Sequence, residues 1–73
     1  MAAYSVVLFH STAHAIRAEK VLGQAGVRTK MIPTPRKLSS DCGKALRFER
    51  GSETRIAAVL EQSRVPINGI HEI

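Results

Sequence analysis

The chain has very little cysteine and few aromatic residues. Cys42 is the single cysteine among 73 residues, and the aromatics are one tyrosine and two phenylalanines. One cysteine excludes an intramolecular disulfide and a two-cysteine zinc or copper site within one chain. No apolar run in the sequence approaches the roughly 20 residues that a membrane-spanning helix needs. A signal peptide requires a positive charge ahead of its apolar run, and no Lys or Arg precedes the short apolar run near the start. We therefore expect a soluble, cytoplasmic protein in a reducing compartment, without a membrane partner.

Length and charge set the next bounds. The 73 residues are too few for two cores, so we expect a single domain over residues 1–73. The net charge of +5 favours an anionic partner, such as nucleic acid or an acidic protein surface. The eleven Lys and Arg residues are scattered along the sequence, so the charge alone selects no partner.

Hydrophobic spacing predicts six elements of secondary structure. Alternation and β-branched residues predict strands over residues 4–9, 27–32, 44–49 and 67–73. Helical spacing predicts helices over residues 13–24 and 53–64, with caps at Ser11-Thr12 and Ser52 and an end at Gly26. Two prolines, two serines and a glycine make residues 33–43 a loop.

The predicted order of these elements is β-α-β-β-α-β. It corresponds to the α+β ferredoxin-like arrangement, in which two helices cover one face of a four-stranded antiparallel sheet. A right-handed crossover makes the first two strands parallel, and the third strand lies between them. The end of the first strand, the start of the first helix and the start of the third strand then share one edge of the sheet, and the proline-rich loop joins them there.

Cys42 is the first candidate for chemistry, because cations and a helix start are predicted near it. Arg36 and Lys44 favour the thiolate form of a thiol, and His10 can add charge or move a proton. Ser11 and Thr12 lie at the positive end of the first helix, which favours an anion. The alternative is a small buried hydrophobe at a junction between loop and strand.

The remaining residues of the loop are expected to shape it. Pro35, Ser40 and Asp41 are turn formers, and Gly43 allows a partner's backbone to approach closely.

Three other kinds of site have weaker support in the sequence. Cys42 with His10 and His14 gives a Cys-His-His set too loosely placed for a metal prediction, so we expect no metal and no resident cofactor. A Cys-His hydrolase lacks an oxyanion loop and a third orienting residue. RNA binding through an RRM-like sheet lacks the stacking aromatics, because Phe48 is expected to face the core with Leu46. Arg28, Lys30 and Arg47 can form a basic outer sheet face, but such charges are more often only solvated, so nucleic acid is not the expected partner.

Several motifs together resemble one known family. They are Phe9-His10-Ser11-Thr12, Ala18-Glu19-Lys20, Ile32-Pro33-Thr34-Pro35-Arg36, Ser39-Ser40-Asp41-Cys42-Gly43 and Leu46-Arg47-Phe48. Over nearly its whole length the chain resembles the small selenium/sulfur carrier protein-like family, and the Pro-Arg to Ser-Ser-Asp-Cys-Gly segment is the most specific part.

The resemblance implies that Cys42 carries sulfur or selenium as a persulfide or selenopersulfide, the only covalent group expected. Pro35, Arg36, Ser40 and Gly43 are the matching motif residues. A carrier of this kind implies a protein donor, of the cysteine desulfurase type, and a protein acceptor, rather than a stand-alone enzyme. The alternative is a small ferredoxin-like binding or regulatory module with a protein or RNA partner and a structural Cys42. Exposed strand edges also allow a homodimer.

Overall fold

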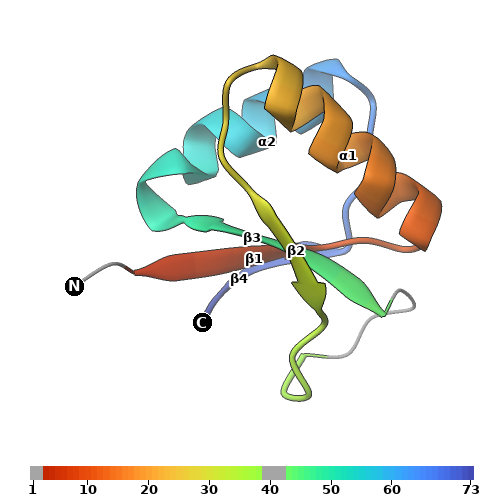
Figure 1. The fold of residues 1–73 in the computed structure, drawn as a ribbon, viewed down its shortest axis with the longest axis vertical. Helices are drawn as coiled ribbons and strands as arrows, with labels where there is room; N and C mark the ends of the chain where they lie inside the picture. The colour runs from red at the N-terminus through yellow and green to blue at the C-terminus, as the bar shows by residue number, and fades with distance from the viewer. Residues whose placement is uncertain (1–2, 39–42) are drawn as a thin grey trace.

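Four strands and two helices make up the fold (Figure 1). The computed structural model describes residues 3–38 and 43–73. In chain order the elements are β1 (Tyr4–Leu8), α1 (Thr12–Gln24), β2 (Lys30–Pro33), β3 (Lys44–Glu49), the 3₁₀ turn η1 (Arg50–Ser52), α2 (Glu53–Gln62) and β4 (Gly69–Glu72). The strands form one antiparallel sheet in the order β2-β3-β1-β4, and both helices lie on the same face of it. The predicted ferredoxin-like fold is confirmed. Within the described part of the chain, neither helix is long and apolar enough to cross a membrane.

Strand β1 is buried on both faces, and each face belongs to a different apolar cluster. The larger cluster, the helix-side core, lies between the sheet and the helices; its buried members include Val7, Phe9, Leu22, Leu46, Phe48, Ile56 and Leu60. The smaller cluster lies on the opposite, outer face and contains Val6, Leu8 and Ala45, with Ile32 and Leu38 packed against it. Because Leu38 belongs to the β2–β3 loop, this loop covers the apolar half of the outer face. Phe48 and Leu46 face the core, as predicted.

Helix α1 is bounded by two caps that the sequence predicts. The Ser11 side chain accepts a hydrogen bond from the His14 backbone N–H at 3.3 Å, which satisfies one of the donors left free at a helix start. At the other end, Gly26 has φ +77°, and Val27 N–H donates to the Leu22 carbonyl at 2.9 Å. This is a Schellman motif, with Gly26 at the left-handed position and Val27 and Leu22 both in the helix-side core.

Helix α2 ends by the same motif, but without a glycine. Val65 N–H donates to the Leu60 carbonyl at 2.9 Å, and Arg64 occupies the left-handed position with φ 55°. The prediction that α2 continues to Arg64 is therefore wrong, because this residue turns the chain back toward the sheet. The Ser52 side chain makes no capping hydrogen bond, and the turn η1 leads into the helix instead.

Two predicted strands start too early. Strand β2 begins at Lys30 rather than at Val27, because the Val27 N–H closes helix α1. Strand β4 begins at Gly69 rather than at Ile67. There Asn68 N–H donates to the Leu8 carbonyl at 2.6 Å, and Gly69 has φ +135°, a conformation that an L side chain rarely adopts.

The two antiparallel helices are joined by reciprocal arginine contacts. Arg17 of α1 donates to the Ser63 carbonyl at the C-cap of α2 at 2.8 Å. Arg55 of α2 donates to the Ala25 carbonyl at the C-cap of α1 at 2.5 Å. Each guanidinium thus meets the negative end of the other helix, where a cation is stabilising. Residues 21–27 and 59–65, VLGQAGV and VLEQSRV, repeat the pattern that builds these ends.

We predict that Arg64→Gly stabilises the protein. An L residue in the left-handed region costs about 1–2 kcal/mol relative to the right-handed one, and glycine removes most of this cost. We expect the free energy of unfolding in urea to rise by about 1 kcal/mol. The matched control is Gly26→Ala at the same position of α1, which should lower it by a similar amount. Equal or lower stability of Arg64→Gly would contradict this reading of the cap.

We also predict that Arg17→Met and Arg55→Met each destabilise the protein by about 0.5–1 kcal/mol. Both arginines are exposed, so water competes for these hydrogen bonds and the loss lies at the low end for charged donors. Urea unfolding of each variant measures it. Lys20→Met, an exposed cation of α1 that removes the same charge, should stay within about 0.5 kcal/mol of the parent. If Lys20→Met destabilised the protein as much as the arginine variants do, the loss of net charge rather than of the C-cap contact would be the cause.

Candidate functional site

Five segments meet at one edge of the sheet, where the carrier site is predicted (Figure 1). In the register, Leu8 at the end of β1 lies opposite Ala45 on one side and Gly69 on the other. Pro33 at the end of β2 lies opposite Lys44 at the start of β3. Because α1 follows β1 after three residues, its start belongs to the same edge. The strand order brings these segments together as the sequence predicts.

The start of α1 supplies a positive helix end at this edge. Ser11 has an extended backbone, its hydroxyl caps the helix, and its carbonyl accepts the Ala15 N–H at 3.2 Å. The hydroxyl is thus engaged with the helix, so the contribution of Ser11 to an anion site is to fix the helix end. His10 and Thr12 flank it and are exposed.

The described parts of the β2–β3 loop are held at two places. At its base, Thr34 N–H donates to the Gly43 carbonyl at 3.0 Å. Leu38 N–H donates to the Pro35 carbonyl at 2.9 Å, which closes a turn that exposes Arg36 and Lys37. Because Leu38 packs on the outer face, this turn lies on that face of the sheet.

The predicted residues Cys42, Ser40 and Asp41 lie outside the described residues, so their roles stay predictions. Their described neighbours are Gly43 and Lys44, both exposed. A Cβ added at Gly43 would meet no heavy atom of the described residues within 4 Å, so none of these residues crowds Gly43.

The turn of the loop forms an apolar cleft with the end of the chain. Pro35, Lys37 and Leu38 line it together with Glu72 and Ile73, and its volume is about 510 Å³. Ile73 is 48% exposed, one of two exposed large hydrophobic residues in the part of the chain that the structure describes. The cleft therefore offers an apolar contact four residues along the chain from the Cys42 position.

A metal site is not assembled by the residues in view. Across residues 3–38 and 43–73, no three His, Cys, Asp or Glu side chains gather closely enough to hold a metal ion. The Cys-His-His set weighed from the sequence includes Cys42, which lies outside these ranges.

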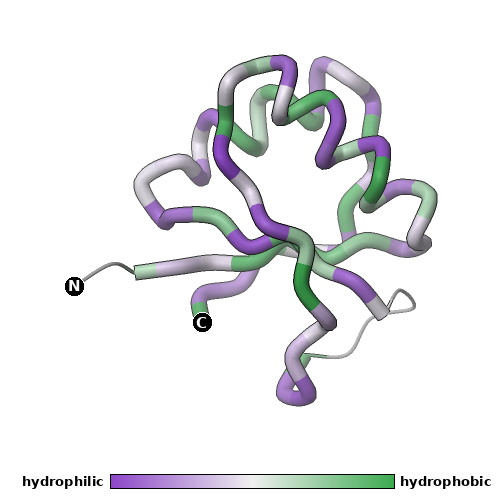
Figure 2. The backbone as a smooth tube through the Cα atoms, in the orientation of Figure 1, coloured by the Kyte–Doolittle hydropathy of each residue, from purple (hydrophilic) through white to green (hydrophobic). Residues whose placement is uncertain are grey.

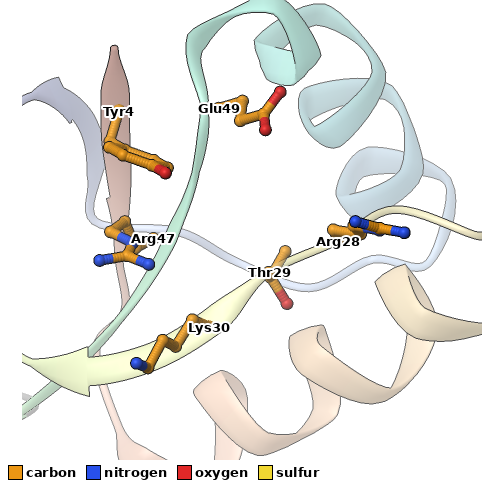
Figure 3. Close-up of a pocket in the computed structure, with 6 residues that line it drawn as sticks. All are labelled: Tyr4, Arg28, Thr29, Lys30, Arg47 and Glu49. Carbon is orange, nitrogen blue, oxygen red and sulfur yellow. The ribbon is translucent and has the colours of Figure 1, made fainter. Parts of the chain in front are cut away.

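A second cleft, at the other end of the sheet, was not predicted as a site. Tyr4, Arg28, Thr29, Lys30, Arg47 and Glu49 line about 180 Å³ (Figure 3). The sequence predicts a basic outer face of Arg28, Lys30 and Arg47, and Tyr4 was not predicted to belong to it. Tyr4 alternates with Val6 and Leu8, and this period places it on the outer face beside Arg47.

Comparison with known proteins identifies a family. A family model described as "Putative Se/S carrier protein-like" matches residues 4–72, nearly the whole chain. No curated protein and no solved structure matches the chain.

Proposed function

Because the chain belongs to the selenium/sulfur carrier protein-like family, we propose that it carries sulfur or selenium on Cys42 as a persulfide or selenopersulfide. The family match over residues 4–72 is the observation that carries the proposal. Cys42 is the single cysteine of the chain, so a sulfur or selenium atom held on cysteine has no other residue to occupy.

Loading is a transfer between sulfur atoms without net oxidation. The Cys42 thiolate attacks the terminal sulfur of a persulfide on the donor protein. A sulfur–sulfur bond forms on Cys42 while the donor's sulfur–sulfur bond breaks, and the donor cysteine leaves as a thiolate. Unloading repeats the step in reverse, with a nucleophile of the acceptor attacking the terminal atom and Cys42 leaving as a thiolate. Selenium follows the same scheme through a sulfur–selenium bond.

The residues predicted to flank Cys42 support a role that needs an anion. Arg36 and Lys44 are close to Cys42 in the sequence, and His10 follows β1 at the edge where β3 begins; these side chains are cationic or ionisable. The capped start of α1 lies at the same edge and directs its positive end there. Together these features favour a thiolate, the form of cysteine that attacks sulfur.

A carrier needs contact surfaces for two proteins and no complete catalytic site. We propose a donor of the cysteine desulfurase type and an acceptor protein, in a reducing cytoplasm that keeps the thiol free. None of the described residues crowds Gly43, and a glycine there allows a partner's backbone to come close. The apolar cleft between Leu38 and Ile73 provides the second contact near the loop.

Loading of Cys42 is tested by incubating the protein with a cysteine desulfurase and labelled cysteine. We expect a mass gain of one sulfur atom, lost on addition of a reductant and absent in Cys42→Ser. Glutathione at the same concentration is the competing thiol, and a carrier should be labelled in preference to it. No mass gain that depends on Cys42, with several competent desulfurases, would exclude the proposal.

The thiolate environment is tested by alkylation against pH. We expect the rate to have a midpoint below about 8.5, the ordinary pKa of a free thiol. Removing a cation destabilises the thiolate, so Arg36→Gln and Lys44→Gln should each move this thiol pKa upward. Lys20→Gln, a distant exposed cation on α1, is the matched control and should leave it unchanged. If alkylation of the unsubstituted protein has the midpoint of an ordinary thiol, the flanking cations do not stabilise the Cys42 thiolate.

A further inference from the structure

Three cations gather at one end of the sheet. The opposite end is the edge where β1 and β2 end and α1, β3 and β4 begin, called the Cys42 edge because Cys42 precedes β3 in the sequence. Lys30 on β2 lies directly opposite Arg47 on β3 in the register, and Arg28 lies two residues before Lys30. Like charges directly opposite across two strands destabilise a sheet. Glu49 is the single carboxylate among the residues that line this cleft. The cluster therefore has an excess of positive charge that an anionic ligand would neutralise.

The same cleft contains a flat surface made by two side chains. The Arg47 guanidinium lies over the Tyr4 ring, 4.5 Å from its centroid. Figure 3 shows the two groups stacked, with Lys30 on the neighbouring strand β2 and Arg28 further along the segment that leads into β2, its side chain pointing away from the stacked pair. Both Tyr4 and Arg47 are half-buried, so part of this stacked pair remains open to solvent. Tyrosine rings and arginine planes are the groups on which unpaired nucleobases stack.

Another cleft beside this one extends the basic surface around the edge of β2. It has a volume of about 220 Å³ and is lined by Gly26, Val27, Arg28, Glu49, Ser52 and Arg55. Arg28 and Glu49 line both clefts, so the two adjoin. Figure 2 shows hydrophilic residues along the segment that leads into β2. Arg47, Lys30, Arg28 and Arg55 thus follow one path, from the outer face of the sheet toward the helices.

We propose that this path, the Tyr4–Arg55 groove, binds a short single-stranded nucleic acid. A base stacks on the Tyr4–Arg47 pair, and the phosphates that follow it lie along Lys30 and Arg28. A row of cations that tracks a backbone beside a stacking platform is the general architecture of single-strand binding. An acidic peptide would use the cations but not the stacked pair, so the observations favour the nucleotide chain.

The groove does not include the proposed carrier residue. Tyr4 and Glu49 lie at the start of β1 and the end of β3, whereas Cys42 precedes the start of β3. Nucleic-acid binding therefore does not depend on the carrier proposal, and Cys42→Ser should bind as the parent does.

The test is fluorescence anisotropy with labelled ten-residue oligo(U) and oligo(dT), titrated with the full chain at low and physiological salt. We expect a dissociation constant of roughly 10⁻⁵ M at low salt that weakens steeply as salt rises. Arg28→Gln with Lys30→Gln should weaken binding at least tenfold at low salt, and should reduce the slope of log K against log salt by about 1.4, since each phosphate contact contributes about 0.7. Tyr4→Leu should weaken binding roughly fivefold or more, through lost stacking.

The matched control is Lys20→Gln with Arg64→Gln, which removes the same charge from other exposed positions and should bind as the parent does. Thermal unfolding of Arg28→Gln with Lys30→Gln should show unchanged or higher stability, because it relieves the Lys30–Arg47 repulsion. Amide shifts in NMR spectra on adding the oligonucleotide should gather at Tyr4, residues 28–30 and residues 47–49. The same titration is repeated with three comparison ligands: uridine monophosphate, polyphosphate and polyglutamate. Each should bind more weakly than oligo(U).

Four results would overturn the proposal as a whole, and a fifth would overturn one part of it. The four are no binding at low salt, equal weakening by the control pair, shifts gathered away from the groove, and binding of polyphosphate or polyglutamate as tight as that of the oligonucleotides. The last would assign the groove to polyanions in general, or to an acidic peptide. Binding of uridine monophosphate as tight as that of oligo(U) would overturn the role of the neighbouring phosphates and leave a site for a free nucleotide.

Discussion

The antiparallel pairing of β1 with β3 is the constraint on which the rest of the structure depends. Strand β1 gives alternate side chains to two clusters, Val7 to the helix-side core and Val6 and Leu8 to the cluster on the outer face. A slip of one residue would exchange these sets, so the two clusters together define the register. That register places Leu8 beside Ala45. The start of α1 and the start of β3, the two segments that flank the proposed carrier site, consequently share an edge.

The helices add a second constraint through their ends. Each ends in a Schellman motif whose last valine belongs to the helix-side core, Val27 for α1 and Val65 for α2. Each C-cap carbonyl also accepts a hydrogen bond from an arginine of the other helix, Arg17 or Arg55. The antiparallel pair thus stabilises itself at both ends. The positive end of α1 lies at the edge where β3 starts, and the chain leaves the C-terminal end of α1 through Gly26 into the basic segment before β2.

The element order and much of the core could be predicted from the sequence, because strand alternation, helical spacing and the Ser11 and Gly26 caps are local signals. The boundaries near residues 27 and 64 could not. Val27 resembles a strand residue, yet its N–H closes a helix, and Arg64 has no intrinsic preference for the left-handed conformation that tertiary packing imposes on it. For the candidate site, the predicted order of the strands was enough to place the start of α1 and the start of β3 at one edge of the sheet. The Tyr4–Arg47 pair was missed because it joins residues far apart in sequence, and its partners are fixed only by the register.

Strand β3 contains Lys44, which follows the proposed carrier residue in the sequence, and Arg47 of the groove, yet the fold separates these two positions. Strand β3 has Lys44 at one end and Arg47 three residues later, a separation of about 10 Å at 3.3 Å per residue. A bound nucleotide chain could cover that distance, but the direct path along the outer face crosses Ala45. Leu38 packs on the cluster to which Ala45 belongs, so the loop closes this path. The open route from the Tyr4–Arg47 pair turns instead around β2, along Arg28 toward Arg55. A nucleic acid in the groove is thereby led away from the Cys42 edge, which leaves that edge accessible to protein partners.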